Sequence, residues 1–321
     1  MALLVTGAMG HVGYEIVRQA AARGRQVVAQ YRGTFREADA RSIDGDVVWI
    51  GLNLADEPAV RVALEKHDID ACIHPAAVPN EGLARPDPLG AVFANTGGVA
   101  TLLETARTRK WRRFLYVSTG SVFQNATDVT PILEDAQPHV TSVYSTTKYC
   151  GELLVAMYRS QFNISAATVR ISWVYGPPLV PRVRDNPRGP IPYFLKCALS
   201  GVAVREPSGA DFAASFTHVS DVASGLLAAA ETPELRHSIY HLGSGTNYST
   251  AVAARAVKAA VPEADIEVGP GTAPWTDHTH MRGPLAGRHL LDDAGFEPRL
   301  GLESGIASFA DWMRANRERW Q

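Results

Sequence analysis

The sequence predicts an α/β fold, a doubly wound parallel sheet with a smaller C-terminal substrate-binding lobe. Three observations carry this prediction. Short apolar, β-branched runs alternate with longer helical patterns over the first two-thirds of the chain. A glycine-rich turn follows the first of these runs directly. The local amino-acid composition then changes after Gly176, where proline, arginine and glycine become frequent.

The predicted strands of the first part are short apolar runs bounded by turn residues. We expect them at residues 3–5, 26–30, 47–50, 71–74, 114–118 and 166–170. Helical patterns separate them and cover residues 11–23, 59–66, 92–108 and 143–161. Because parallel strands need long crossover connections, this alternation predicts a parallel sheet.

The chain after residue 177 begins with a surface loop that runs to about Pro192. Further elements are expected at residues 191–199, 202–204, 216–218, 219–230, 239–242, 250–261 and 302–319. We assign residues 1–177 to a first domain, to which residues 216–243 return. Residues 178–215 and 244–321 form mainly the lobe, over the carboxyl edge of the sheet where open α/β folds bind ligands.

Composition narrows the class of protein. The 321 residues are 46% hydrophobic and 20% charged, with 31 Lys and Arg against 33 Asp and Glu, so no nucleic-acid-binding surface is predicted. Three cysteines are too few and too scattered for a disulfide framework or a metal site. No apolar run approaches transmembrane length and no signal peptide is recognisable. We expect a cytoplasmic protein.

The glycine-rich turn is residues 6–13, Thr-Gly-Ala-Met-Gly-His-Val-Gly. It lies between a predicted strand and a predicted helix, with glycines at positions 7, 10 and 13. Glycine allows a tight turn and close approach of the backbone to a ligand, and the helix N-terminus offers free N–H groups to a pyrophosphate. The first domain is therefore expected to be a dinucleotide-binding Rossmann domain.

The end of the second strand indicates which dinucleotide binds. A carboxylate there accepts from the ribose 2′-hydroxyl of NAD, whereas an arginine accommodates the 2′-phosphate of NADP. The sequence reads Gln30-Tyr31-Arg32, which favours NADP over NAD. Two alternatives for Arg32 stay open, a solvated charge and a side chain stacked on adenine.

Tyr144 and Lys148 are four residues apart, so that both side chains lie on one face of the predicted helix. A tyrosine ionises near pH ~10, and lowering that pKa by about three units needs roughly 4 kcal/mol. A positive charge ~4 Å away supplies about 1 kcal/mol in water but about 4 kcal/mol at an effective dielectric constant of 20. A half-buried pair of this kind can therefore act as a general acid and base.

The glycine loop and the Tyr-x-x-x-Lys pair together resemble the extended short-chain dehydrogenase/reductases, the NAD-dependent epimerase/dehydratase family. Further matching segments are spread over most of the chain. They are His74-Pro75-Ala76-Ala77, Asn95-Thr96-Gly97-Gly98 with Leu102-Leu103-Glu104, Tyr116-Val117-Ser118-Thr119 with Val122-Phe123, Arg170 through Tyr175-Gly176-Pro177, and Phe216-Thr217-His218-Val219-Ser220-Asp221-Val222.

The resemblance implies roles for the matching residues. Tyr144 is the expected proton donor and acceptor, Lys148 lowers its pKa and bonds the nicotinamide ribose, and Thr119 orients the substrate oxygen. The implied reaction is hydride transfer between a carbinol carbon and nicotinamide. The expected cofactor-binding residues are Gly7, Met9, Gly10, His11, Val12, Tyr31, Arg32, Asn53, Leu54, Pro75, Ala76, Ala77, Asn95, Ser118, Tyr144, Lys148 and Val174. The expected substrate-binding residues are Ser118, Thr119, Gly120, Arg182 and Arg282.

Three departures from the family pattern bear on the reaction. Asn53 stands where the family usually has an aspartate that contacts adenine. Gly120-Ser121 follow Thr119 where family dehydratases carry Asp-Glu, which argues against dehydration of a sugar. Ala214 stands where nucleotide-sugar enzymes usually have an arginine for the diphosphate, and the loss removes strong charge-assisted bonds. Arg282 could match a second diphosphate arginine of the family.

Two charged segments of the lobe have no assigned role. Arg182, Arg184 and Arg188 either clamp an acidic substrate or solvate a loop. His278 and His280 lack further ligands at sensible spacing, so that we expect them in the substrate pocket and predict no metal.

We expect an NAD(P)-dependent oxidoreductase acting on a sugar, sugar acid or similar polyhydroxylated substrate. The alternatives are a nucleotide-sugar epimerase with tightly bound NAD and a dinucleotide-binding regulator without activity. The family usually dimerises through the helices expected at 92–108 and 143–161, which implies a homodimer.

Overall fold

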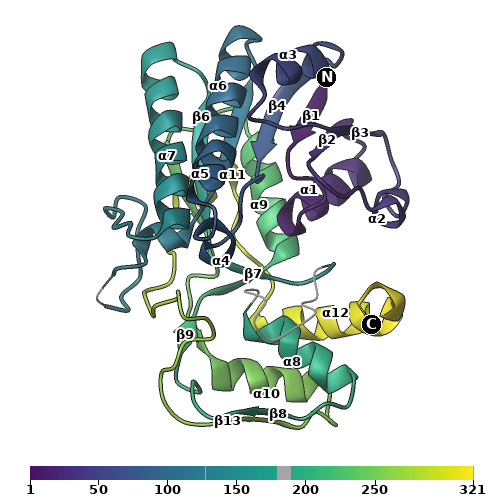
Figure 1. The fold of residues 1–321 in the computed structure, drawn as a ribbon, viewed down its shortest axis with the longest axis vertical. Helices are drawn as coiled ribbons and strands as arrows, with labels where there is room; N and C mark the ends of the chain where they lie inside the picture. Colours follow the sequence, from purple (N-terminus) through teal and green to yellow (C-terminus); the bar gives the residue numbers. More distant parts are fainter. Residues whose placement is uncertain (127, 179–188, 321) are drawn as a thin grey trace.

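The computed structural model describes residues 1–126, 128–178 and 189–320. A seven-stranded parallel sheet forms the upper part of the molecule in Figure 1, in the order β11-β6-β5-β4-β1-β2-β3. The strands are β1 (Ala2–Val5), β2 (Val27–Tyr31), β3 (Val47–Gly51), β4 (Ile69–His74), β5 (Arg113–Thr119), β6 (Ala166–Ile171) and β11 (Ile239–Leu242).

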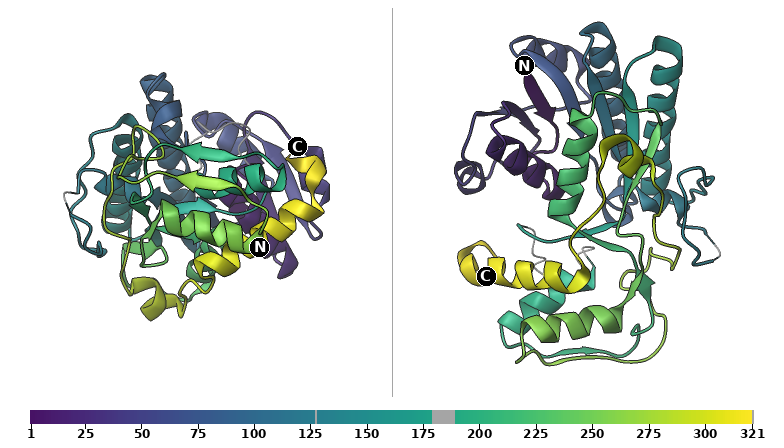
Figure 2. Two further views of the ribbon diagram at one scale, coloured as in Figure 1. Left: turned by 90° about the horizontal axis from the view of Figure 1, so that it is seen from below. Right: turned by 180° about the vertical axis from the view of Figure 1, so that it is seen from behind.

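Helices cover both faces of this sheet, as the alternating pattern predicts. One face carries α1 (His11–Ala22), α9 (Val219–Glu231) and α11 (His289–Ala294) over one hydrophobic core. The other face carries α3 (Glu57–Glu65), α6 (Gly98–Thr108) and α7 (Val143–Phe162) over a second core. The doubly wound fold is therefore confirmed, and the reversed view in Figure 2 shows α9 beside α1.

The position of the ligand-binding crevice follows from the strand order. The chain runs outward from β1 through β2 to β3, and then crosses to β4 on the other side of β1. The loops that leave the carboxyl ends of β1 and β4 therefore diverge, and open α/β sheets bind ligands at such a switch point. The glycine loop and residues 75–77 both begin there.

The helix expected at residues 92–108 has a different form in the structure. It begins earlier, as α5 (Pro88–Val92), and passes through a π-helical turn, η1 (Phe93–Gly97), into α6. Such turns accommodate one extra residue and recur at functional sites. Here Asn95 lies in the turn, and its buried amide accepts from Val78 N at 2.7 Å and donates to Thr147 Oγ1 at 3.0 Å.

The lobe lies below the carboxyl edge of the sheet in Figure 1 and has a hydrophobic core of its own. Its helices are α8 (Pro190–Leu199), α10 (Thr250–Ala260) and α12 (Leu302–Ala315). Its short strands are β8 (Val204–Glu206) paired with β13 (Ile266–Val268) and β9 (Ala213–Ala214) paired with β12 (Tyr248–Ser249), while β7 (Trp173–Tyr175) pairs with β10 (Phe216–His218) at the junction.

Two segments late in the chain return to the sheet domain. The helix α11 packs against β11 and α9 rather than within the lobe. After α12, a 3-10 turn, η3 (Arg317–Arg319), brings Arg319 to the carboxylate of Asp39 in α2 (Glu37–Arg41). The end of the chain is thus tied to the edge of the sheet domain near β2.

Candidate active site

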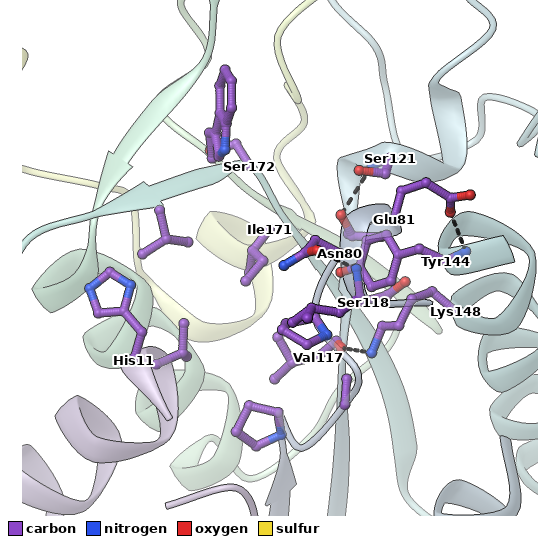
Figure 3. Close-up of a pocket in the computed structure, with 18 of the residues that line it drawn as sticks. His11, Asn80, Glu81, Val117, Ser118, Ser121, Tyr144, Lys148, Ile171 and Ser172 are labelled. Carbon is purple, nitrogen blue, oxygen red and sulfur yellow. Dashed lines mark hydrogen bonds between the residues drawn. The ribbon is translucent and has the colours of Figure 1, made fainter. Parts of the chain in front are cut away.

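A cavity of about 870 Å³ lies between the carboxyl edge of the sheet and the lobe. Its walls come from the loops after β1, β2, β4, β5 and β6 and, on the lobe side, from residues 213–215, Asn247, 275–280 and 282–283. Figure 3 shows the part of this cavity around α7 and β5. The volume lies within the range of small-molecule and cofactor sites.

The glycine loop is fixed by close packing of backbone. Gly7 has φ +56°, and a Cβ there would lie 2.9 Å from Ala76 Cα. A Cβ on Gly13 would lie 2.3 Å from the carbonyl oxygen of Gly7. Gly10 is the N-cap of α1, so that the first N–H groups of this helix have no partner within it. This backbone cradle fits a dinucleotide pyrophosphate, because the N–H groups and the dipole at a helix N-terminus favour an anion.

The end of β2 contributes aromatic and basic side chains to the cavity wall. The residues that line it here are Tyr31, Arg32, Thr34 and Arg36. The described lining also contains two carboxylates, Glu81 and Asp277, but both come from other segments. Arg36 Nη2 donates to the carbonyl oxygen of Met9 at 2.6 Å, which braces the glycine loop. Sequence reasoning missed Thr34 and Arg36, because they lie beyond the expected end of the strand.

Tyr144 and Lys148 enter the cavity from the first turns of α7. The helix begins with a capping box in which Ser142 and Ser145 bond each other's backbone N–H groups. Lys148 is buried, and its Nζ donates to the carbonyl oxygen of Val117 at 2.7 Å. Burial lowers the pKa of Lys148 to about 7, and the negative charge of Glu152 partly opposes this effect. Tyr144 is half-buried and faces the same cavity (Figure 3).

The end of β5 supplies two hydroxyl groups. Thr119 is the last residue of the strand, and its Oγ1 accepts from Ser121 N at 3.1 Å. Ser118 lies almost entirely below the surface, and its hydroxyl donates to Glu152 at 2.5 Å. Glu152 also pairs with buried Arg170 at 2.7 Å. The side chain of Ser118 is thus held by a buried ion pair, whereas Thr119 ends the strand at the cavity.

The segment after β4 connects the two loops of the crevice. His74 Nδ1 and Thr6 Oγ1 are 2.7 Å apart, and Ala76 N donates to Thr6 Oγ1 at 3.3 Å. Burial lowers the pKa of His74 to about 3, so this imidazole is neutral at physiological pH. Pro75, Ala76 and Ala77 line the cavity directly.

Arg282 lines the opposite, lobe side of the cavity. Its Nη2 lies 3.4 Å from the position that a Cβ on Gly120 would take. Burial lowers the pKa of Arg282 to about 10, which leaves the guanidinium charged at neutral pH. No carboxylate in the described part of the chain pairs with it, while its carbonyl oxygen accepts from Asn247 Nδ2 at 2.7 Å. A guanidinium next to Gly120 that no carboxylate of the described residues neutralises suits an anionic group.

Most of the predicted site residues line this one cavity, but not all. Three expected cofactor-binding residues do not line the cavity: Asn53, Leu54 and Asn95. Asn53 is exposed, Leu54 packs against Gly98, and Asn95 lies behind the loop after β4. Gly120 lies beneath Arg282 without lining the cavity. Arg182, with Arg184 and Arg188, lies outside the described residues. Sequence reasoning missed Glu81, Gln124 and Asn247, which line the cavity from segments without a recognisable motif.

His278 and His280 line the cavity, as expected from the sequence, beside Trp275 and Asp277. Gln124 donates its amide to the carbonyl oxygen of His278, which fixes the lobe loop over the end of β5. Within the described ranges, no group of three or more histidine, cysteine, aspartate or glutamate residues is arranged to hold a metal ion. None of the helices there has the length and apolar character needed to cross a membrane.

Comparison with known proteins shows the family. The model of the NAD dependent epimerase/dehydratase family matches residues 3–243. The chain belongs to this family. Its membership confirms the predictions of an extended short-chain dehydrogenase/reductase and of an enzyme with nicotinamide-dependent hydride-transfer chemistry.

Individual relatives are distant, and those described here align over nearly the whole chain. The dTDP-glucose 4,6-dehydratase of Actinoplanes sp. is 26% identical over the full length of both proteins. Among solved structures, UDP-glucose 4-epimerase of Thermotoga maritima with UDP-glucose superposes with a TM-score of 0.87 at 20% identity, covering 99% of this chain and 100% of that one. MoeE5 in complex with UDP-glucose and NAD gives a TM-score of 0.80 at 25% identity, covering 99% and 100%.

Proposed function

We propose that this enzyme transfers a hydride between nicotinamide and a carbinol or carbonyl carbon of a sugar that carries an anionic group, with Tyr144 as acid and base. One observation carries the proposal: Tyr144, Lys148 and Thr119 line the same cavity as the glycine loop. A proton-transfer group and a dinucleotide cradle in one cavity are what coupled hydride and proton transfer needs.

Each group in the cavity has a separate role in the proposed reaction. Bound nicotinamide supplies the hydride acceptor or donor. Tyr144 takes the hydroxyl proton as the carbinol is oxidised and returns it in the reverse direction, while Thr119 bonds the same substrate oxygen. Lys148 stabilises the phenolate of Tyr144 by its charge, and phenolate formation in turn favours the charged ammonium. The two groups therefore titrate as a coupled pair.

Among anionic sugars we favour nucleotide sugars. The dehydratase, epimerase and MoeE5 relatives carry dTDP-glucose or UDP-glucose in their names or complexes. The guanidinium of Arg282, which has no carboxylate partner among the described residues, suits a diphosphate, because charge-assisted bonds to phosphate are strong. Residue 214 of this wall is alanine where the family usually has a second arginine. We therefore expect weaker diphosphate binding than two arginines would give. Gly120 and Ser121 supply no carboxylate for loss of water, and the proposed reaction includes none.

A second candidate is a nucleotide-sugar epimerase, in which oxidation and re-reduction occur without release of the cofactor. The Thermotoga maritima structure supports it at the level of fold. Such an enzyme purifies with bound dinucleotide and shows no net change of nicotinamide absorbance during turnover. A dehydrogenase consumes free cofactor instead. Ala214 does not separate the two candidates, because both would bind the diphosphate of a nucleotide sugar; the fate of the cofactor separates them.

For the cofactor we propose NADP over NAD. Arg32 and Arg36 line the end of the cavity nearest β2, and no carboxylate of the described lining comes from that loop. An arginine there accommodates the 2′-phosphate, and a carboxylate would repel it. Against this stands the NAD bound to MoeE5, so parallel assays with both dinucleotides decide between them.

We further propose a cytoplasmic homodimer in which the lobe binds the substrate and the sheet domain the dinucleotide. Exposed apolar side chains lie on α5, η1 and α7, which pack side by side; they are Leu89, Val92, Phe93, Leu153 and Met157. Apolar surface of this kind typically marks an interface. The three cysteines are free thiols, which suits a reducing compartment. Light scattering of the purified protein measures the assembly.

The test of the function is a substrate panel assayed with NAD and NADP in parallel. The panel holds free sugars, sugar acids, UDP-glucose, dTDP-glucose and UDP-glucuronic acid, and nicotinamide absorbance and product stereochemistry are recorded together. We expect net cofactor reduction or oxidation with a nucleotide sugar. Epimer formation without net absorbance change would select the second candidate. No cofactor-dependent change of any substrate would contradict both.

A further inference from the structure

A carboxylate that no motif predicts touches the helix that carries Tyr144. Glu81 is the first residue of α4 (Glu81–Ala84), and its Oε2 accepts from the backbone N–H of Tyr144 at 2.8 Å (Figure 3). The position of α4 is itself fixed at its start, where Asn80 Oδ1 accepts from Leu83 N at 3.0 Å. Glu81 thus reaches from the loop after β4 to the start of α7.

The N–H group of Tyr144 needs such a partner. Tyr144 is the second residue of α7, and the first N–H groups of a helix have no acceptor within it. The capping box provides the Ser142 hydroxyl for Ser145 N, and Glu81 provides the acceptor for Tyr144 N. A carboxylate also interacts favourably with the positive end of the helix dipole. The main chain from which the phenol projects is therefore fixed from two sides.

The contact of Glu81 with the main chain also brings a negative charge to the residue that carries the phenol. A negative charge near a tyrosine disfavours the phenolate, and a positive charge favours it. The charged and titratable groups on the elements near Tyr144 include Lys148 and Glu152 on α7, Tyr116 on β5, Glu81 on α4 and Arg85 just after it. On the lobe side, Asp277, His278, His280 and Arg282 line the same cavity. Among them, Glu81 bonds the backbone of Tyr144 directly, and its charge is opposite in sign to that of Lys148.

We propose that Glu81 is a positioning residue for Tyr144, which fixes the backbone beneath the phenol and makes the phenol less ready to lose its proton. The proposal rests on the acid and base role assigned to Tyr144. It gives Glu81 two separable effects, one through its oxygen as an acceptor and one through its charge. Glutamine keeps the acceptor oxygen without the charge, whereas alanine removes both.

Glu81 also lines a smaller adjoining cavity of about 410 Å³, together with Arg85, Thr141 and His280. A competing role is therefore direct contact with a substituent of the substrate. Contact with substrate alone would raise KM and leave kcat and the ionisation of Tyr144 unchanged. Positioning of Tyr144 lowers kcat and changes that ionisation.

The test compares Glu81→Gln and Glu81→Ala with the unchanged enzyme in two measurements. The first is steady-state kinetics from about pH 6 to 10, because a tyrosine with a lowered pKa titrates in roughly this range. The second is an ultraviolet difference titration of the tyrosinate band, with Tyr144→Phe subtracted to isolate Tyr144. The titration needs no turnover, so it separates failure of this proposal from failure of the proposed reaction.

We expect Glu81→Ala to lower kcat about 10- to 100-fold, because a small displacement of a catalytic group is costly. Glu81→Gln should keep kcat within about threefold at its optimum. It should move the Tyr144 titration, and the acidic limb of kcat/KM for oxidation, to lower pH by on the order of half a unit. The sign follows because loss of a negative charge favours the phenolate.

The matched control is Asp87→Asn. Asp87 caps the next short helix, α5, with its Oδ1 accepting from Gly90 N at 2.9 Å, and it lies outside both cavities. It should leave kinetics and titration unchanged. A Tyr144 titration at the same pH in Glu81→Gln and the unchanged enzyme would overturn the charge effect. Unchanged kcat in folded Glu81→Ala, with only KM raised, would overturn positioning in favour of substrate contact.

Discussion

The glycine loop builds its part of the cavity from main chain, whereas the lobe builds the opposite wall from side chains. Around the glycine loop, Gly7 and Gly13 sit so close to neighbouring backbone that no Cβ fits. Across the cavity, Arg282, Asn247 and His278 reach in from lobe loops that carry no regular motif. Between the two sides stand Tyr144 and Lys148 on α7.

This difference determines which substitutions each side of the cavity can tolerate. A backbone cradle depends on the absence of side chains, so that substitutions there damage the cofactor site through sterics. Side chains on loops can change without disturbing the sheet, and they set which substrate is held. Substitutions on the two sides should therefore affect different kinetic constants, and loss of the Tyr144 hydroxyl between them should affect turnover.

The largest effect is expected from Tyr144→Phe. The substitution removes the hydroxyl that carries the proton, and general acid-base catalysis contributes about 10²–10⁴-fold. We expect kcat to fall by about 10³-fold while the dissociation constant of the dinucleotide stays within about twofold. The control is Tyr158→Phe on the same helix, whose hydroxyl donates to Glu104 outside the cavity. Equal kinetics of Tyr144→Phe and the control would remove Tyr144 from the mechanism.

Arg282→Ala tests the substrate side. Its guanidinium has no carboxylate partner among the described residues, and a hydrogen bond to a charged group contributes about 1.5–3 kcal/mol. We expect KM for a nucleotide sugar to rise about 10- to 100-fold, with cofactor affinity unchanged. The exposed Arg288, which pairs with Asp292, is the control. A rise in the cofactor dissociation constant with an unchanged KM for the sugar would show that Arg282 contributes to the cofactor site and not to the substrate site.

Gly13→Ala tests the cofactor side. The new Cβ would lie 2.3 Å from the Gly7 carbonyl oxygen, so the loop must shift. Overpacking of this kind typically costs about 1–3 kcal/mol, and we expect cofactor affinity to fall by about tenfold. Gly97→Ala is the control, since Gly97 has helical backbone angles and open space around it. Undiminished cofactor binding by Gly13→Ala in a calorimetric titration would show that the cradle tolerates side chains.

The same difference explains what could be predicted from the sequence. The strand at residues 239–242 was predicted with its exact bounds, because a buried parallel strand is a short apolar run. The glycine loop was predicted because tight backbone turns require glycine, and Tyr144 with Lys148 because a fixed helical spacing connects them. Each of these signals is local in the chain.

Other features depend on tertiary structure and left no local signal. The π-helical turn around Asn95 depends on the buried partners Val78 and Thr147. The role of Glu81 depends on where a four-residue helix lies relative to α7. Asn53 was expected in the cavity through resemblance, but its exposed side chain bonds the nearby Ala55 N. The lobe residues are brought to the cavity by loops, whose paths periodicity cannot specify.

The most direct measurement of the central claim is the fate of the hydrogen on the reacting carbon. The best substrate of the panel is prepared with deuterium at its carbinol carbon and incubated with the preferred dinucleotide, and mass spectrometry follows the label. We predict that the unchanged enzyme moves deuterium to the nicotinamide ring and that Tyr144→Phe moves little over the same time. Turnover with the label lost to solvent, or with the label retained on the substrate carbon of a product that is not an epimer, would contradict hydride transfer in this cavity.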